Sequence, residues 1–174
     1  MSASKKEPGI KAVGLSKAAY QDYGRLIRAD ESEPFKAANM GTAKRFNHLC
    51  ELENLRSDKA KLNLCIFRCS PLREKHLELR LLEKHQHSSQ VFMPMARDGK
   101  YLAVVCLGSE KPDLTTLKAF IVEGAVGVSY FPGVWHYPMT ALENQLDFSC
   151  LVYENESPDD CQIEYLEQPV IIEL

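Results

Sequence analysis

A tryptophan and a histidine stand side by side where this sequence is best suited to chemistry. Trp135, the only tryptophan, and His136 follow Gly133, which permits a bend after the β-type run 126–130. An imidazole can carry a proton or bind a metal near neutral pH, and a neighbouring indole can exclude water from a pocket. The pair indicates a pocket floor; the alternative is that Trp135 belongs to the core and His136 is only its hydrogen-bonded neighbour.

Two more histidines come directly after an alternating strand pattern. His85 and His87 are two residues apart, so an extended backbone places both side chains on one face. Together with Gln90 and His136 they are candidate metal ligands, because imidazoles suit transition metals. A carboxylate ligand is missing at the expected spacing, and the sequence leaves open whether the protein needs no cofactor or one divalent metal ion. The alternative places His87 on an exposed polar turn, so that only His85 faces inward.

Two arginines are candidates for binding an anion. Arg68 lies in the apolar strand pattern 61–69, where a buried and unpaired guanidinium would be costly. It therefore needs either an anionic ligand or a salt bridge, and the sequence leaves both open. Arg45 follows Asn39 in a loop-like segment.

Composition describes an ordinary globular chain. Of the 174 residues 45% are hydrophobic and 26% are charged, and the net charge of −3 leaves no electrostatic footprint for nucleic acid or an anionic membrane. The six cysteines form no CxxC pair, and residues 1–8 lack the apolar core of a secretory signal. We therefore expect a cytoplasmic protein with reduced thiols and no nucleic-acid or membrane partner. A flexible tail at 1–9 is expected to precede one domain at 10–174.

Short strand patterns separated by turn signals predict an all-β sandwich or barrel. The segment 76–83 alternates, which places Leu77, Leu79 and Leu81 on one apolar face. The turn signal Asp98-Gly99 predicts a hairpin between the flanking strand patterns 90–93 and 101–107.

Helix signals are few. Ser16 is a plausible N-cap for a helix over 17–23 that ends at Gly24, and 114–118 resembles a single helical turn. The prediction is one antiparallel β-barrel with a short N-terminal helix.

Three segments are similar to the ureidoglycolate lyase family. They are LLEKHQHSSQVFMPM at 81–95, KPDLTTLKAFIVEGAVGVSYFPGVWHYPM at 111–139 and, more weakly, AANMGTAKRF at 37–46. The likeness runs from about Val13 to Leu166. Three positions depart from the family pattern: Gln86 replaces a proline, Tyr137 a second histidine and Phe67 an asparagine.

The resemblance implies a cupin-like barrel, often a homodimer, with its pocket inside the barrel. It implies cleavage of the small molecule (S)-ureidoglycolate to glyoxylate and urea in allantoin degradation. His85 and His136 would act as acid and base, because elimination needs both. The residues implied in substrate binding are Asn39, Arg45, Arg68, Gln90 and Trp135.

Two functions of other classes remain open on the sequence. One is a metal-dependent cupin oxygenase or isomerase that uses His85, His87 and His136. The other is a non-catalytic barrel that binds a small molecule.

Overall fold

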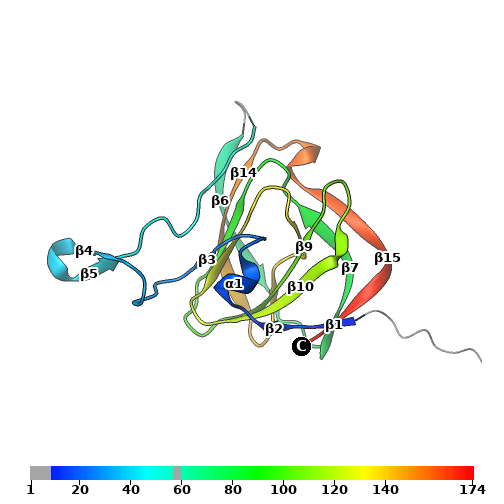
Figure 1. The fold of residues 1–174 in the computed structure, drawn as a ribbon, viewed down its shortest axis with the longest axis horizontal. Coiled ribbons are helices and arrows are strands. Elements are labelled where there is room, and N and C mark those ends of the chain that lie inside the picture. Colours follow the sequence, from blue (N-terminus) through cyan, green and yellow to red (C-terminus); the bar gives the residue numbers. More distant parts are fainter. Residues whose placement is uncertain (1–8, 57–59) are drawn as a thin grey trace, which may run out of the picture.

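Two curved β-sheets face each other around a shared apolar interior in the computed structural model, which describes residues 9–56 and 60–174 (Figure 1). The pairs β1–β15 and β2–β10 are parallel, and the other strand pairs of the described residues are antiparallel. The larger sheet has the strand order β1 (Gly9–Lys11), β15 (Gln162–Glu173), β7 (His76–Lys84), β12 (Trp135–His136), β9 (Lys100–Leu107), β10 (Asp113–Glu123) and β2 (Val13–Gly14), with β13 (Thr140–Ala141) also paired to β9.

The second sheet closes the other side of the interior. Its order is β3 (Leu26–Ile27), β11 (Gly127–Tyr130), β8 (Gln90–Pro94), β14 (Leu146–Glu154) and β6 (Lys61–Cys69). Tyr101 of the larger sheet meets Phe148 of the smaller one edge-on, with ring centroids 5.0 Å apart. Such aromatic contacts join the sheets into one core, so the predicted mainly β barrel is confirmed.

The predicted helix near the N-terminus is present but short. α1 covers only Lys17–Tyr20, and the hydroxyl of Ser16 accepts a hydrogen bond from the Ala19 amide at 3.3 Å. The chain then turns at Gly24, where a Cβ would lie 1.7 Å from the Ser129 carbonyl oxygen. Only glycine allows the chain to pass this close to β11. Within the described residues, no helix has the length and apolar character needed to cross a membrane.

The alternation in β7 changes phase, which corrects the prediction for Leu81. Leu77 and Leu79 are buried as expected, but Leu81 is only half-buried and Leu82 is fully buried. The partner strand β15 shifts register at this point, between Tyr165 and Val170. The irregularity changes which side chains at the end of β7 face the core.

The predicted hairpin at 98–99 is wrong. β8 and β9 belong to different sheets, so this turn carries the chain across the barrel rather than between paired neighbours. Gly99 packs against Leu146, whose side chain would lie 3.0 Å from an added Cβ. The sequence predicts the turn itself, but contacts with distant residues determine which sheet the next strand joins.

The predicted helical turn at 114–118 is also wrong, because this segment lies inside β10. The Asp113 carboxylate accepts hydrogen bonds from the Thr115 amide at 3.1 Å and from its hydroxyl at 2.6 Å. This local turn produces a register shift between Asp113 and Lys118 in the ladder with β9. A capping pattern therefore appears as a bulge in a strand.

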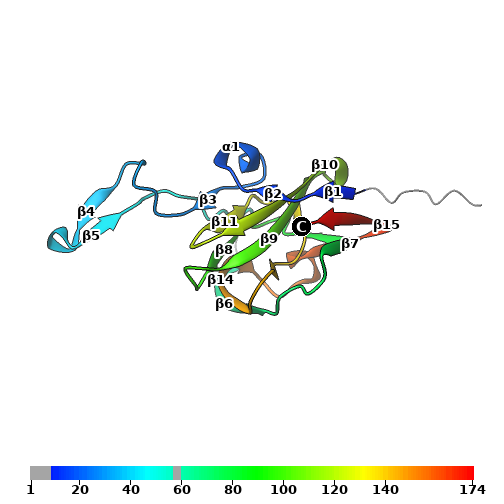
Figure 2. The same ribbon diagram turned by 90° about the horizontal axis from the view of Figure 1, so that it is seen from below.

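A hairpin projects from the barrel, well separated from its body (Figures 1 and 2). It consists of β4 (Lys36–Ala38), the 3-10 turn η1 (Asn39–Gly41) and β5 (Ala43–Arg45), and we call residues 34–49 the arm. Phe35 and Phe46 contact each other at its base, with ring centroids 5.8 Å apart. A further 3-10 turn, η2 (Pro158–Asp160), connects β14 to β15.

The phase change in β7 can be tested by stability. Replacing the fully buried Leu82 by Ala should lower the free energy of unfolding by about 2–5 kcal/mol, the usual cost of a large core cavity. Leu81→Ala is the matched control on the same strand and should cost clearly less, because Leu81 is only half-buried. Urea unfolding followed by circular dichroism measures both. A larger loss in the Leu81 variant would contradict the burial described here.

Candidate active site

Two imidazoles and one carboxylate meet inside the barrel. Glu83 lies near the end of β7, His85 directly follows that strand, and His136 lies on β12 opposite Glu83 in the ladder. One ligand atom from each of the three side chains lies within 4.8 Å of the others. His85 and His136 are buried, and their rings stack with centroids 5.6 Å apart. The two predicted catalytic histidines therefore share one site.

Main-chain carbonyls fix the tautomer of both histidines. Nδ1 of His85 lies 2.8 Å from the Asp160 carbonyl oxygen, and Nδ1 of His136 lies 3.0 Å from that of Val134. A carbonyl oxygen only accepts, so each Nδ1 carries a proton and donates it. In the neutral rings Nε2 is then the unprotonated nitrogen. Both Nε2 atoms are available as a proton acceptor or a metal ligand.

The same region holds several buried polar atoms without a protein partner. His136 stacks on Tyr130 with ring centroids 4.1 Å apart, and Tyr130 is paired with Gln90 across the ladder between β11 and β8. Atoms without a hydrogen-bond partner are His85 Nε2, His136 Nε2, Tyr130 OH and Gln90 Oε1. Buried polar atoms are normally satisfied, so this cluster of exceptions is suited to binding a polar ligand. We call Glu83, His85, Gln90, Tyr130 and His136 the histidine site.

Electrostatics favour a neutral His85 and an ionised Glu83. Burial lowers the pKa of His85, and the nearby His136 lowers it further, against a smaller opposing effect of the Asp160 carbonyl and Glu83. Burial alone would raise the pKa of Glu83, but its interactions with His136 and His85 outweigh this and the net pKa is lowered. Glu83 Oε1 lies 3.5 Å from His136 Nε2, at the outer limit of a hydrogen bond. The carboxylate can therefore stabilise a protonated His136.

Glu83 is the residue that sequence reasoning missed. No carboxylate was found at metal-ligand spacing, yet Glu83 is two residues before His85, the same spacing that was used to pair His85 with His87. On an extended backbone Glu83 and His85 share a face. The signal was present in the sequence, but it was hidden because Glu83 closes a run of alternating leucines and charged residues.

His87 and Trp135 lie outside this cluster. His87 is on the polar turn, where its Nε2 lies 3.4 Å from Asp159 Oδ2, so the structure places only His85 inward. Trp135 is fully buried in a second apolar cluster with Leu79 and Leu82, and β12 directs it to the opposite side from His136. The interpretation of Trp135 as a core residue is the one that its contacts favour.

Arg68 is already paired. Its Nε and one terminal nitrogen donate to the two carboxylate oxygens of Asp147 at 2.9 and 2.8 Å, on the outer face of the smaller sheet. The side chain is 68% exposed. A bidentate partner and an outward position satisfy the guanidinium by the salt bridge that the sequence left open.

Asn39 begins η1 and Arg45 ends β5, so both belong to the arm, which projects away from the barrel (Figure 1). Both are exposed, and Asn39 adopts the left-handed conformation with a φ of 51°. One chain therefore brings together His85, His136 and Gln90 from the predicted set. It leaves Asn39, Arg45, Arg68 and Trp135 elsewhere.

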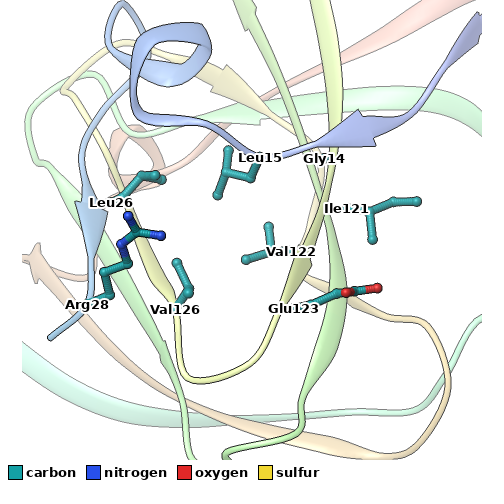
Figure 3. A pocket seen from close by; sticks show the side chains of 8 residues that line it. All are labelled: Gly14, Leu15, Leu26, Arg28, Ile121, Val122, Glu123 and Val126. Carbon is teal, nitrogen blue, oxygen red and sulfur yellow. The ribbon is translucent and has the colours of Figure 1, made fainter. Parts of the chain in front are cut away.

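An open hollow of about 410 Å³ lies in a different part of the barrel (Figure 3). Its lining is largely aliphatic, and Figure 3 shows the Arg28 side chain extending towards Leu26 and Val126. Arg28 pairs with Asp30 at 2.5 Å, and Glu123 pairs with Lys100 at 3.0 Å. The hollow has the size of a ligand pocket but lacks an acid–base pair, so the histidine site is the better candidate for chemistry.

The donor set also fits a divalent metal ion. Two imidazole nitrogens and one carboxylate are the ligands of many catalytic sites for zinc and for similar ions. Glu83, His85 and His136 would hold the ion, which would supply a Lewis acid for a substrate oxygen. The Nδ1 hydrogen bonds to carbonyl oxygens are the usual support of metal-binding histidines, and they equally suit two histidines that transfer protons.

Known proteins resemble this chain over nearly its whole length. The family model described as ureidoglycolate lyase matches residues 7–173. A ureidoglycolate lyase of Saccharomyces cerevisiae is 37% identical over 90% of this chain and 93% of its own. One from Escherichia coli strain SMS-3-5 is 35% identical over 89% of this chain and 92% of its own.

Among solved structures, RmlC from Streptococcus suis in complex with dTDP-D-xylose is similar with a TM-score of 0.39 and 15% identity, over 88% of this chain and 75% of that one. The family match spans all residues of the histidine site. The chain belongs to the ureidoglycolate lyase family.

Proposed function

We propose that this protein cleaves (S)-ureidoglycolate to glyoxylate and urea, as a carbon–nitrogen lyase of allantoin breakdown. The observation that carries the proposal is the group of buried, unpartnered polar atoms on His85, His136, Tyr130 and Gln90. The family membership selects the substrate, since the relatives are named ureidoglycolate lyases. The geometry supports acid–base catalysis at two imidazoles as the kind of chemistry.

His85 is the proposed base and His136 the proposed acid. The lowered pKa of His85 keeps its Nε2 unprotonated at neutral pH, so it can take the proton of the substrate hydroxyl. As the carbon–oxygen double bond forms, the carbon–nitrogen bond breaks and its electron pair goes to the urea nitrogen. His136, whose Nε2 lies 3.5 Å from the Glu83 carboxylate, is the group proposed to donate a proton to that nitrogen. Glu83 adjoins both rings and can help return the proton from His85 to His136.

The remaining substrate groups need donors and a cation. Gln90 has a buried amide with an unpartnered oxygen, which suits an NH group of the ureido moiety. The substrate carboxylate suits an arginine fork. Arg45 is a better candidate than Arg68 for binding this carboxylate, because the Arg68 guanidinium already donates two hydrogen bonds to Asp147. Asn39, next to the arm turn, is proposed as a second amide partner of the ureido group.

We propose that the enzyme acts in the cytoplasm, as a homodimer. All six cysteines are free thiols, as expected in a reducing compartment. An exposed apolar edge strand supports the dimer. The strand is β6, which carries the exposed side chains of Leu62, Leu64 and Ile66.

Product analysis tests the reaction class. Purified protein incubated with (S)-ureidoglycolate should release glyoxylate and urea in equal amounts, because elimination leaves the ureido group intact. Glyoxylate, urea and ammonia are measured in the same reaction, with a chelator-treated sample and metal analysis in parallel. Stoichiometric ammonia without urea would instead indicate hydrolysis of the ureido amide. Iron at one equivalent, with no lyase turnover, would favour the oxygenase alternative.

Alanine variants test the two histidine roles. His85→Ala and His136→Ala should each lower kcat/KM by roughly 10²-fold or more, the usual effect of losing a general acid or base. His87→Ala is the matched control on the adjoining turn and should have a much smaller effect, since His87 pairs with Asp159 outside the cluster. Equal damage from all three substitutions, with loss of a bound metal, would return His87 to the site.

The pH profile tests the assignment of the base. The acidic limb of kcat/KM reports protonation of the free-enzyme base, so its midpoint should lie below the ordinary histidine value of about 6.5. Falling pH protonates His85 and removes activity, and burial shifts this event to lower pH. Glu83→Gln removes a negative charge that raises the pKa of His85, so the limb should move lower still. A midpoint above 6.5, or an upward shift in the variant, would contradict the assignment.

A further inference from the structure

The histidine site has no cation of its own to receive an anionic substrate. Within the described residues, the contacts that its side chains make beyond the site include the carbonyls of Val134 and Asp160 and the thiol of Cys161. The nearest arginine, Arg56, is already paired with the carboxylates of Asp159 and Asp160. Two carboxylates act on the histidine site, because Glu83 and Glu154 both raise the pKa of His85. A carboxylate substrate would be repelled by this charge. On the proposed function, the site of one chain is therefore incomplete.

The arm carries a positive charge that could bind the substrate carboxylate, but it does not pack against the barrel of its own chain. None of residues 31–50 is buried, and Met40 at the tip is fully exposed, at 104% of its reference area. Among the described residues, the Arg45 side chain forms no salt bridge or hydrogen bond. A two-stranded hairpin without a packed face is marginal in water at best, so the arm needs another surface to hold its shape.

The tip of the arm is also strained. Asn39, Met40 and Gly41 have φ values of 51°, 55° and 92° in succession. Left-handed conformations cost free energy for residues other than glycine and are kept where surrounding contacts impose them. No such contacts come from the barrel, because β4 and β5 pair only with each other. The strain points to a partner that grips the tip.

A second copy of this chain is the partner that fits. The arm leaves the barrel beside β3, one edge strand of the smaller sheet, and β6 is the other edge strand of that sheet (Figures 1 and 2). We call the outer side of β6 with Leu62, Leu64 and Ile66 the β6 face; these side chains are 45%, 67% and 55% exposed. An exposed apolar edge strand and a projecting arm on one chain suit a two-fold contact, in which each copy gives and receives the same surface.

We infer that two copies pack through the β6 face and exchange arms, so that Arg45 of each chain binds the substrate carboxylate in the histidine site of the other. The inference rests on the proposed function for the identity of the substrate. Charge complementarity supports it. The arm carries Lys36 and Arg45 besides Lys44, which pairs with Glu31, and the carboxylates of Glu83 and Glu154 act on His85. Asn39 beside the strained tip would enter with Arg45.

Mixed dimers test the exchange directly. Arg45→Ala and His136→Ala homodimers should both be nearly inactive. A mixture of the two after subunit exchange contains dimers in which one site combines an intact pocket with an intact arm. With random pairing, activity should return to roughly a quarter of wild type. If each arm instead served its own barrel, both sites of the mixed dimer would lack a residue, so the mixture would stay inactive and overturn the inference. An Arg45→Ala homodimer with wild-type kcat/KM would overturn it as well.

A second measurement does not depend on turnover. Leu64→Arg places a charge in the β6 face, and Leu114→Arg is the matched control at an exposed leucine of β10. Light scattering should find a dimer for wild type and the control and a monomer for Leu64→Arg. Amide hydrogen exchange should be slow in residues 35–46 of the dimer and fast in the monomer.

The two measurements separate the inference from the proposed function. A wild-type monomer, or an arm that exchanges fast in the dimer, would overturn the arm exchange whether or not ureidoglycolate is cleaved. Protection of the arm without any ureidoglycolate turnover would leave the exchange of arms standing and reject the substrate.

Discussion

Two main-chain carbonyls decide what the histidine site can do. The carbonyls of Val134 and Asp160 each hold a proton on Nδ1 of an imidazole and thereby leave Nε2 as the reactive nitrogen. Without them either ring could turn or change tautomer. The two elements that supply these carbonyls, the bend before β12 and the turn η2 before β15, come from distant parts of the chain. The barrel is the structure that keeps them in place.

Burial gives the two imidazoles different tasks although they are the same residue type. Both are removed from water, which by itself disfavours the charged form. His85 has a lowered pKa, and His136 lies closer to the Glu83 carboxylate, which can stabilise its protonated form. A site with one ready base and one supported acid suits an elimination, in which one proton is removed and another is donated. The same three groups would also bind a divalent cation, so measurement of the metal content belongs with any study of the rate.

Within one chain, the groups that would transfer protons lie far from the arginine that would bind the substrate carboxylate. The barrel holds the acid and base, whereas the unpaired arginine of the predicted set stands on an exposed arm. An anionic substrate would then be bound only where two chains meet. Such a division would make activity depend on assembly, because a monomer would have the reacting groups but not the guanidinium that holds the carboxylate.

The sequence by itself determined the fold class and the two histidines. Short strand patterns, turn residues and the segments around His85 and His136 depend on local spacing, which is readable without a structure. The strand pattern predicts the barrel, and the family resemblance predicts that these two histidines share one site. Even the carboxylate of Glu83 was within reach, since it stands two residues before His85.

Only the tertiary structure decided the rest, because it depends on contacts between distant residues. The phase change in β7 follows from a register shift in β15, and it buries Leu82 in place of Leu81. The turn at Gly99 leads to another sheet because Leu146 packs against it. Arg68 and Trp135 have suitable side chains, but the ladder directs them away from His136, towards Asp147 and towards the second apolar cluster. Residue type indicates which chemistry is available, and the direction of each strand face determines which residues share it.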